Sequence, residues 1–190
     1  MSVIETELNK IQEVVTQLQT PESVSNIQAL ADACISAIQN SKKIMFAGNG
    51  GSAADAQHWS AELIARFNYD RPSIASIALT VDTSALTAIG NDYGYDYVFA
   101  RQIEGLGHEG DVFIAISTSG NSPNIVRAVD AAKAKGITTI GFTGQKGGKL
   151  KDMCDLCFCA PSTETPHIQE AHAIVGHMLC ALIEMAIYPK

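Results

Sequence analysis

The first forty residues carry two runs of apolar side chains at helical spacing. The first run consists of Ile4, Leu8, Ile11, Val15 and Leu18. A break at Thr20-Pro21-Glu22 separates it from a second run made of Ile27, Leu30, Ala31, Cys34, Ile35 and Ile38. This spacing predicts two amphipathic helices. We expect residues 1–40 to form a helical pair that packs on the rest of the chain and on a second subunit.

From residue 41 onward, short apolar runs alternate with helical segments. The apolar runs are Lys43–Ala47, Ile74–Leu79, Val112–Ile116, Ile137–Phe142 and Leu156–Cys159. Such alternation is typical of a parallel sheet covered by helices on both faces. We therefore predict one α/β unit over residues 41–190, a three-layer α/β/α arrangement with a five-stranded parallel sheet. Ligands of such sheets bind beyond the carboxyl ends of the strands, so the loops after the strands are the candidate site.

The loop after the first predicted strand is rich in glycine and leads into a helix. Gly48-Asn49-Gly50-Gly51 forms the turn, and Ser52 with Asp55 is an approximate capping box at the helix start. Free N–H groups and the positive end of the helix dipole would attract an anion such as phosphate there. The same letters satisfy the dinucleotide fingerprint, from Gly48 to Ala53, with Asp82 as the ribose ligand.

The helix after this turn carries two reactive side chains on one face. His58 and Glu62 are four residues apart, about one helical turn. A dinucleotide-binding fold has no use for this pair, whereas an imidazole beside a carboxylate suits proton transfer and metal binding. We therefore favour a phosphate anchor that leads into a base and a candidate metal ligand. Arg66 and Arg71, which follow the helix, could help to bind a phosphate, but we expect them to be exposed and solvated.

The loop after the third predicted strand is rich in hydroxyl groups. Ser117, Thr118, Ser119 and Ser122 lie within six residues, and Ser122 is the expected N-cap of a helix that begins at Pro123. Hydroxyls and free amides at a helix start can hold a phosphate by hydrogen bonds without a lysine. Because this loop follows a strand end opposite the glycine turn, we predict that it binds a phosphate group.

Composition and charge narrow the class of protein. The 190 residues are 46% hydrophobic, which suits one globular unit with its own core. A net charge of -7 argues against a broad nucleic-acid surface. The N-terminus has no signal-type apolar core, and we expect no segment apolar enough to span a membrane, so we predict a cytoplasmic protein. The five cysteines are interpreted as small buried side chains.

Taken in order, these motifs resemble the sugar isomerase (SIS) domain family, and within it the phosphoheptose isomerases. The resemblance covers nearly the whole chain and rests on Gly48–Ser52, the pair His58 and Glu62, Gly90-Asn91-Asp92-Tyr93-Gly94, Ser117–Ser122 and Ile168-Gln169-Glu170-Ala171-His172. It implies reversible conversion of sedoheptulose 7-phosphate to D-glycero-D-manno-heptose 7-phosphate. That reaction opens the ADP- or GDP-heptose route to the core of bacterial lipopolysaccharide.

The resemblance also implies roles for individual residues. Substrate contacts are implied for Asn49, Gly50, Gly51, Ser52, Glu62, Asn91, Asp92, Ser117, Thr118, Ser119, Ser122 and Gln169. One zinc ion per subunit is implied, with the ligands His58, Glu62, Gln169 and His177. Glu62 and His177 match the family's proton-transfer pair. The chain departs from the family pattern at Pro166 and His167, where Asp-Arg is usual.

Isomerase chemistry asks for the same residue types. Moving a carbonyl through an enediol needs a base, for which Glu62 is suited, and an acid, for which His177 is suited. Zinc would polarise the carbonyl. Gln169 and His177 lie about 12 Å apart along a regular helix, so either Gln169 precedes the helix or the two serve sites in different subunits. His172 is the spare candidate. We predict an active site at a subunit interface, in a homotetramer that the resemblance implies.

Two other functions remain open. The family includes a non-catalytic protein that associates with the bacterial replication initiator, and this chain shares its Gly-Asn-Gly turn and a segment like Gly107–Asp111. That relative lacks the acid and the histidine that match Glu62 and His177, so their presence favours the enzyme. The second alternative is an isomerase of another sugar phosphate, such as an arabinose or hexulose derivative, which only an assay distinguishes.

Overall fold

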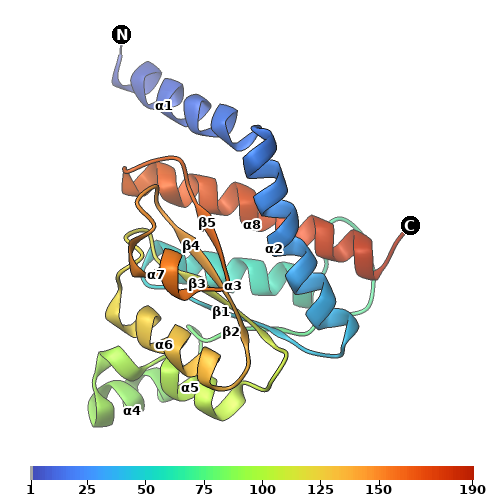
Figure 1. Ribbon diagram of the computed structural model, residues 1–190, viewed down its shortest axis with the longest axis vertical. Coiled ribbons are helices and arrows are strands. Elements are labelled where there is room, and N and C mark those ends of the chain that lie inside the picture. The colour runs from blue at the N-terminus through green and yellow to red at the C-terminus, as the bar shows by residue number, and fades with distance from the viewer. Residues whose placement is uncertain (1) are drawn as a thin grey trace.

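The chain forms a sheet between two layers of helices, and the computed structural model describes residues 2–190 of it (Figure 1). The strands are β1 (Ile44–Ala47), β2 (Ser76–Ala78), β3 (Val112–Ile116), β4 (Thr138–Thr143) and β5 (Leu156–Cys159). The helices are α1 (Val3–Leu18), α2 (Pro21–Gln39), α3 (Gly51–Ile64), α4 (Thr83–Tyr93), η1 (Tyr95–Tyr97), α5 (Ala100–Leu106), α6 (Pro123–Ala134), α7 (Gly148–Met153) and α8 (Thr165–Ile187). The predicted α/β class and the helical pair at the N-terminus are confirmed.

The five strands pair in parallel in the order β2-β1-β3-β4-β5. All residues of β1 and β3 are buried, as expected for central strands covered on both faces. Three strands differ from their predicted bounds, and β1 does so only by beginning at Ile44 instead of Lys43. The apolar run from Ile74 begins β2 only at Ser76, because the Ile74 N–H donates to the carbonyl of Leu63 in α3. Likewise the Ile137 N–H donates to Ala132 in α6, and β4 begins at Thr138.

Alternate side chains of the strands feed two separate hydrophobic cores. Val112, Ile114 and Ile116 of β3 join the core formed with α1, α2, α3 and α8. Phe113 and Ala115 face the core formed with α4, α5, α6 and α7. Side chains alternate in this way because successive residues of a pleated strand point to opposite faces of the sheet.

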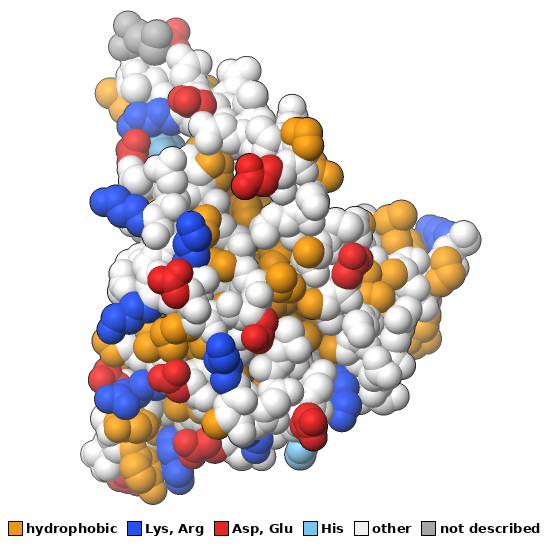
Figure 2. Space-filling view, in the orientation of Figure 1, with side chains coloured by type: hydrophobic (Ala, Val, Ile, Leu, Met, Phe, Trp, Pro, Cys, Tyr) orange, Lys and Arg blue, Asp and Glu red, His pale blue; other side chains and the backbone are white. Residues whose placement is uncertain are grey.

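Helix α1 is buried only at its C-terminal end. Ser2 and Glu5 form a reciprocal capping box at its start, and Val14 and Leu18 pack into the core. The other half extends beyond the sheet in Figure 1 and leaves Ile4 72% and Leu8 61% exposed. On the face drawn in Figure 2, acidic and basic side chains are interspersed rather than gathered by sign. That face therefore carries no patch of a single charge sign.

Helix α8 corrects one expectation from the sequence. By length and composition it is apolar enough to cross a membrane, with a mean hydropathy of 1.4, although no segment was expected to pass that test. Its apolar side chains have another explanation in the fold. Val175, Leu179 and Ile183 are buried in the core shared with α2 and α3. Helix α8 is thus a core helix of this domain, and it also carries polar side chains that contribute to the site.

Candidate active site

The glycine turn after β1 is tighter than the sequence predicts. Helix α3 begins at Gly51 after Gly50, whose φ of 56° is the left-handed conformation that favours glycine. The predicted capping box of Ser52 and Asp55 is wrong, because no side chain caps this helix and Ser52 lies buried in its first turn. A Cβ on Gly48 would lie 2.4 Å from the Ser52 carbonyl oxygen. The turn therefore depends on glycine at two positions.

Asp55 points inward instead of capping the helix. Its Oδ2 atom is buried without a hydrogen-bond partner. Burial raises the pKa of this carboxyl to about 6, and the nearby His58 opposes that rise. The sequence analysis assigned Asp55 no chemical role, since its position near the helix start suited capping. It is a titratable group one turn before His58 on the same helix.

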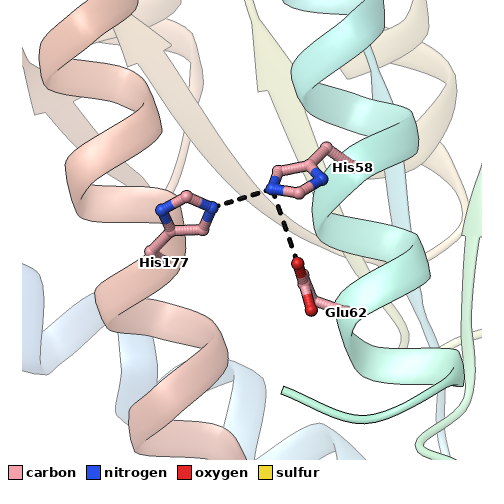
Figure 3. A group of neighbouring side chains, drawn as sticks. All are labelled: His58, Glu62 and His177. Atoms are coloured by element: carbon pink, nitrogen blue, oxygen red, sulfur yellow. Dashed lines mark hydrogen bonds and ion pairs between the residues drawn. The ribbon is translucent and has the colours of Figure 1, made fainter. Parts of the chain in front are cut away.

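His58, Glu62 and His177 converge between α3 and α8 (Figure 3). The Nε2 atoms of the two histidines are 2.8 Å apart, and Glu62 Oε1 is 3.5 Å from His58 Nε2. One ligand atom from each residue lies within 4.8 Å of the other two. The His58 side chain is 52% exposed and that of Glu62 is 23% exposed, so an ion or substrate can reach the group. Two imidazoles and one carboxylate are a donor set that zinc binds in catalytic sites.

Gln169, the fourth expected ligand, lies elsewhere on α8. Because α8 begins at Thr165, Gln169 is inside the regular helix, and the explanation that it precedes the helix is wrong. Its side chain lies over the glycine turn, where a Cβ on Gly51 would be 2.5 Å from Gln169 Nε2. Gln169 is therefore beside the predicted anion site, eight residues before His177 on the same helix. Its assignment to a site shared between subunits stays a prediction.

The hydroxyl loop after β3 has the predicted helix start and a hydrogen-bonded cluster. Ser122 is the N-cap of α6 and Pro123 its first residue, as predicted. The Ser122 hydroxyl makes no capping bond, because it lies 3.0 Å from the Ser117 hydroxyl. The hydroxyls of Ser117 and Ser119 are 3.4 Å apart. Three of the four predicted hydroxyls thus face one another at the start of a helix, which suits an anion.

A polar cavity of about 360 Å³ opens beside this loop. Thr118 and Ser119 line it together with Gln145 and Lys146 from the loop after β4. Lys146, which was not among the predicted site residues, is a positive charge on the wall of this cavity. A larger cavity of about 450 Å³ lies at the opposite ends of the strands, next to Lys42 and Glu109. It contains none of the predicted site residues, whereas the smaller cavity is lined by Thr118 and Ser119 of the hydroxyl loop.

The glycine turn and the hydroxyl loop are joined by a pair of amides. The side chains of Asn49 and Asn124 exchange two hydrogen bonds of 2.9 Å, and the Tyr95 hydroxyl donates to Asn49 Oδ1. Asn124 and Tyr95 were not among the predicted residues, because neither stands within a recognisable motif. Asn91 and Asp92, which were predicted, are exposed at the end of α4 and pair with each other.

His172, the spare candidate, is a core residue. Its side chain is fully buried, and its Nε2 donates to the Thr143 carbonyl over 3.0 Å. Burial lowers the pKa of the imidazole to about 4. His172 therefore stays neutral and lies outside the group formed by His58, Glu62 and His177.

Comparison with known proteins gives the family. The family model described as the SIS domain matches residues 8–144. A phosphoheptose isomerase of Burkholderia pseudomallei is 54% identical over 167 residues, which cover 88% of this chain and 85% of that protein.

Two solved structures share the fold over almost their whole length. The phosphoheptose isomerase of Neisseria gonorrhoeae has a TM-score of 0.89 and 40% identity, and the match covers 95% of this chain and 96% of that one. The phosphoheptose isomerase of Francisella tularensis has a TM-score of 0.88 and 34% identity, with coverage of 97% and 100%. The chain therefore belongs to the SIS domain family, and within it to the phosphoheptose isomerases.

Proposed function

We propose that this protein is a zinc-dependent phosphoheptose isomerase that interconverts sedoheptulose 7-phosphate and D-glycero-D-manno-heptose 7-phosphate. The observation that carries the proposal is the convergence of His58, Glu62 and His177 between α8 and α3, the helix that begins after the glycine turn. The names of the relatives described above support the sugar class. In this proposal the reaction is the first step of nucleotide-heptose synthesis for lipopolysaccharide core, in the cytoplasm.

Two of the three residues would move the protons. Glu62 takes the proton from C1 of the open-chain ketose and returns it to C2, which passes the sugar through an enediol. His177 moves a proton between the two sugar oxygens and assists ring opening, since a neutral imidazole can accept a proton at one ring nitrogen and donate one from the other. The distances within the group of three are short enough for both to reach one sugar.

The same residues fit a metal ion by donor chemistry. His58, Glu62 and His177 would hold zinc, which supplies Lewis-acid polarisation of the carbonyl when bound. A carboxylate has two oxygens, so Glu62 can face the ion with one and the sugar proton with the other. Gln169 lies beside the glycine turn of its own chain. We therefore propose that it contacts the substrate or the metal in the site of a neighbouring subunit.

The phosphate would bind between the two helix starts. Hydroxyls of Ser117, Thr118, Ser119 and Ser122 and the amides of the glycine turn Asn49–Ser52 would donate to its oxygens. Lys146, on the rim of the adjacent cavity, would add a positive charge. Asn91 and Asp92 remain the proposed contacts to sugar hydroxyls.

The assembly is proposed to be a homotetramer with interfacial active sites. The exposed apolar side chains of α1, among them Ile4 and Leu8, support a role for residues 1–40 as an assembly surface. Monomeric proteins seldom leave such groups uncovered in one patch.

An isomerase assay tests the proposal. Purified protein is incubated with sedoheptulose 7-phosphate, with and without a chelator, and the aldose is measured. We expect turnover that the chelator abolishes and zinc restores, and a loss of roughly 10²- to 10⁴-fold in Glu62→Gln. Glu109→Gln, an exposed acid at the opposite strand ends, is the matched control and should keep full activity. Turnover of an arabinose or hexulose phosphate instead would support the alternative isomerase, and tight binding of the replication initiator without turnover would support the binder.

A further inference from the structure

A buried ion pair joins the two structural elements that carry the candidate ligands. Arg71 lies in the segment after α3, and Glu184 lies near the end of α8; Arg71 Nε and Glu184 Oε1 are 3.1 Å apart. The two side chains are 2% and 0% exposed. The expectation of an exposed Arg71 is therefore wrong. Its partner Glu184 is the second of two acids in α8, and no sequence pattern marks it as buried.

Arg71 binds the end of the helix that carries Glu62. Its guanidinium donates to the carbonyl of Glu62 over 2.8 Å and to those of Leu63 and Ala65 over 2.6 Å and 3.2 Å. The carbonyls of the last helical turn have no partner within the helix, and a cation is favoured there by the helix dipole. One side chain thus fixes the backbone of the proposed base.

Glu184 binds the segment that leads to the other side of the site. Its two carboxylate oxygens accept from the N–H groups of Phe67 and Asn68 at 3.0 Å and 2.8 Å. Burial alone would raise the pKa of this carboxyl, but the two N–H groups and Arg71 outweigh it and lower the pKa. The Phe67 ring stacks on the His177 imidazole with centroids 5.7 Å apart and planes at 29°. Glu184 itself is two turns beyond His177, on the same face of α8.

Stability does not account for this arrangement. Taking two charges out of water costs about as much as their attraction returns, so well-packed apolar residues in place of a buried pair are often as stable or more so. What an apolar pair cannot supply is the set of directed bonds to Glu62, Leu63, Phe67 and Asn68. These bonds fix where α3 ends and how the Phe67 ring lies against His177.

We infer that Arg71 and Glu184 are positioning residues for the active site, which hold Glu62 and His177 at the separation that metal binding and proton transfer require. The inference rests on the proposed function for the roles of those two residues. It adds a pair that touches neither metal nor sugar. Outer partners of this kind typically change metal affinity or activity by roughly 10- to 100-fold when they are altered.

Two variants test the inference. Arg71→Lys keeps the buried charge but loses the planar fork that binds the carbonyls of Glu62, Leu63 and Ala65 at the end of α3. The double variant Arg71→Met/Glu184→Leu removes both charges, so no unpaired charge is left in the core. Metal-free protein is titrated with cobalt(II) and its absorption spectrum recorded. Turnover of sedoheptulose 7-phosphate and thermal unfolding are measured on the same samples.

We expect cobalt affinity and kcat to fall about tenfold or more in both variants, with KM changed little because the phosphate loop is remote. Asp111→Asn is the control: it breaks the Lys43–Asp111 pair, whose aspartate is also buried, at the opposite ends of the strands. It should lower stability without changing cobalt affinity or kcat. Folded variants with wild-type cobalt affinity and kcat would overturn the inference alone. A wild-type protein that neither binds cobalt nor isomerises the sugar would overturn the proposed function as well.

Discussion

Gly176 of α8 packs directly against Trp59 of α3, and its replacement by alanine should drive the two helices apart. A Cβ at this position would lie 2.1 Å from Trp59 Cε2 and 2.4 Å from Cζ2 and Nε1. Carbon atoms in contact are normally about 3.5–4.0 Å apart, so the ring or the helix has to move by more than ~1 Å. Trp59 is 1% exposed and lies between Phe46 and Phe142, which leaves the ring no free space.

Two effects of opposite sign set the size of the change. Alanine in place of glycine within a helix stabilises it by about 1 kcal/mol. Overpacking a filled core costs about 1–3 kcal/mol and occasionally more, and the distance to an immobile ring puts Gly176→Ala at the upper end. We therefore expect a net loss of about 2 kcal/mol. Because His177 is the next residue, the shift should also separate it from His58 and lower turnover more than substrate affinity.

Urea unfolding followed by Trp59 fluorescence measures the first effect, and steady-state kinetics measures the second. Gly105→Ala is the matched control, because Gly105 lies in α5 with nothing within 4 Å of an added Cβ. It should leave turnover unchanged and raise stability by up to about 1 kcal/mol. If Gly176→Ala is as stable and as active as the wild type, the close packing of α8 on α3 is not what sets the site geometry.

Three further predictions concern pH, phosphate and assembly. Burial lowers the pKa of His172 to about 4 in the folded state. Because the unfolded chain takes up a proton at this histidine near pH 6.5, the free energy of unfolding decreases as the pH falls from ~6.5 toward 4, by up to ~3 kcal/mol. The melting temperature of His172→Gln should change less between pH 7 and pH 5 than that of the wild type, and an equally steep change would contradict this. Asp55, whose pKa is raised, changes stability in the opposite direction by the same amount in both proteins. Ser119→Ala should raise KM for the sugar phosphate about tenfold with unchanged stability, since a hydrogen bond to a charged group is worth ~1.5–3 kcal/mol, and an unchanged KM would exclude Ser119 from the phosphate site. Ile4→Glu/Leu8→Glu should shift sedimentation toward smaller species, and an unaltered tetramer would show that this face of α1 is not the assembly surface.

The strongly periodic parts of the fold could be predicted from the sequence. Apolar residues at a period of 3.6 predicted the helices α1 and α2, and short continuous apolar runs predicted the buried strands β1 and β3. The strand order and the exact helix starts were not available from those periods. Helix α3 begins one residue before the predicted start, because left-handed Gly50 ends the turn without a side-chain cap.

Site residues could be predicted where a single motif contains several of them. They could not be predicted where the fold brings together residues that are far apart in the sequence. His58 and Glu62 follow from helical spacing, whereas the approach of His177 depends on how α8 crosses α3. The burial of Glu184 and its pairing with Arg71 could not be predicted, because no sequence pattern marks the partner of an acid in an apolar helix. Gln169 was grouped with His177 by resemblance, and the helix geometry separates them.

Deuterium transfer tests the central claim most directly, which is that Glu62 and His177 act on one sugar. Sedoheptulose 7-phosphate is incubated with the zinc-loaded protein in D₂O, and the product is analysed by NMR. The account predicts an aldose that carries deuterium on carbon C2, because the proton held by Glu62 exchanges with D₂O before C2 is protonated, and aldose formation that is slower by roughly 10²-fold or more in Glu62→Gln. Formation of the same deuterated aldose by Glu62→Gln at the wild-type rate would contradict it.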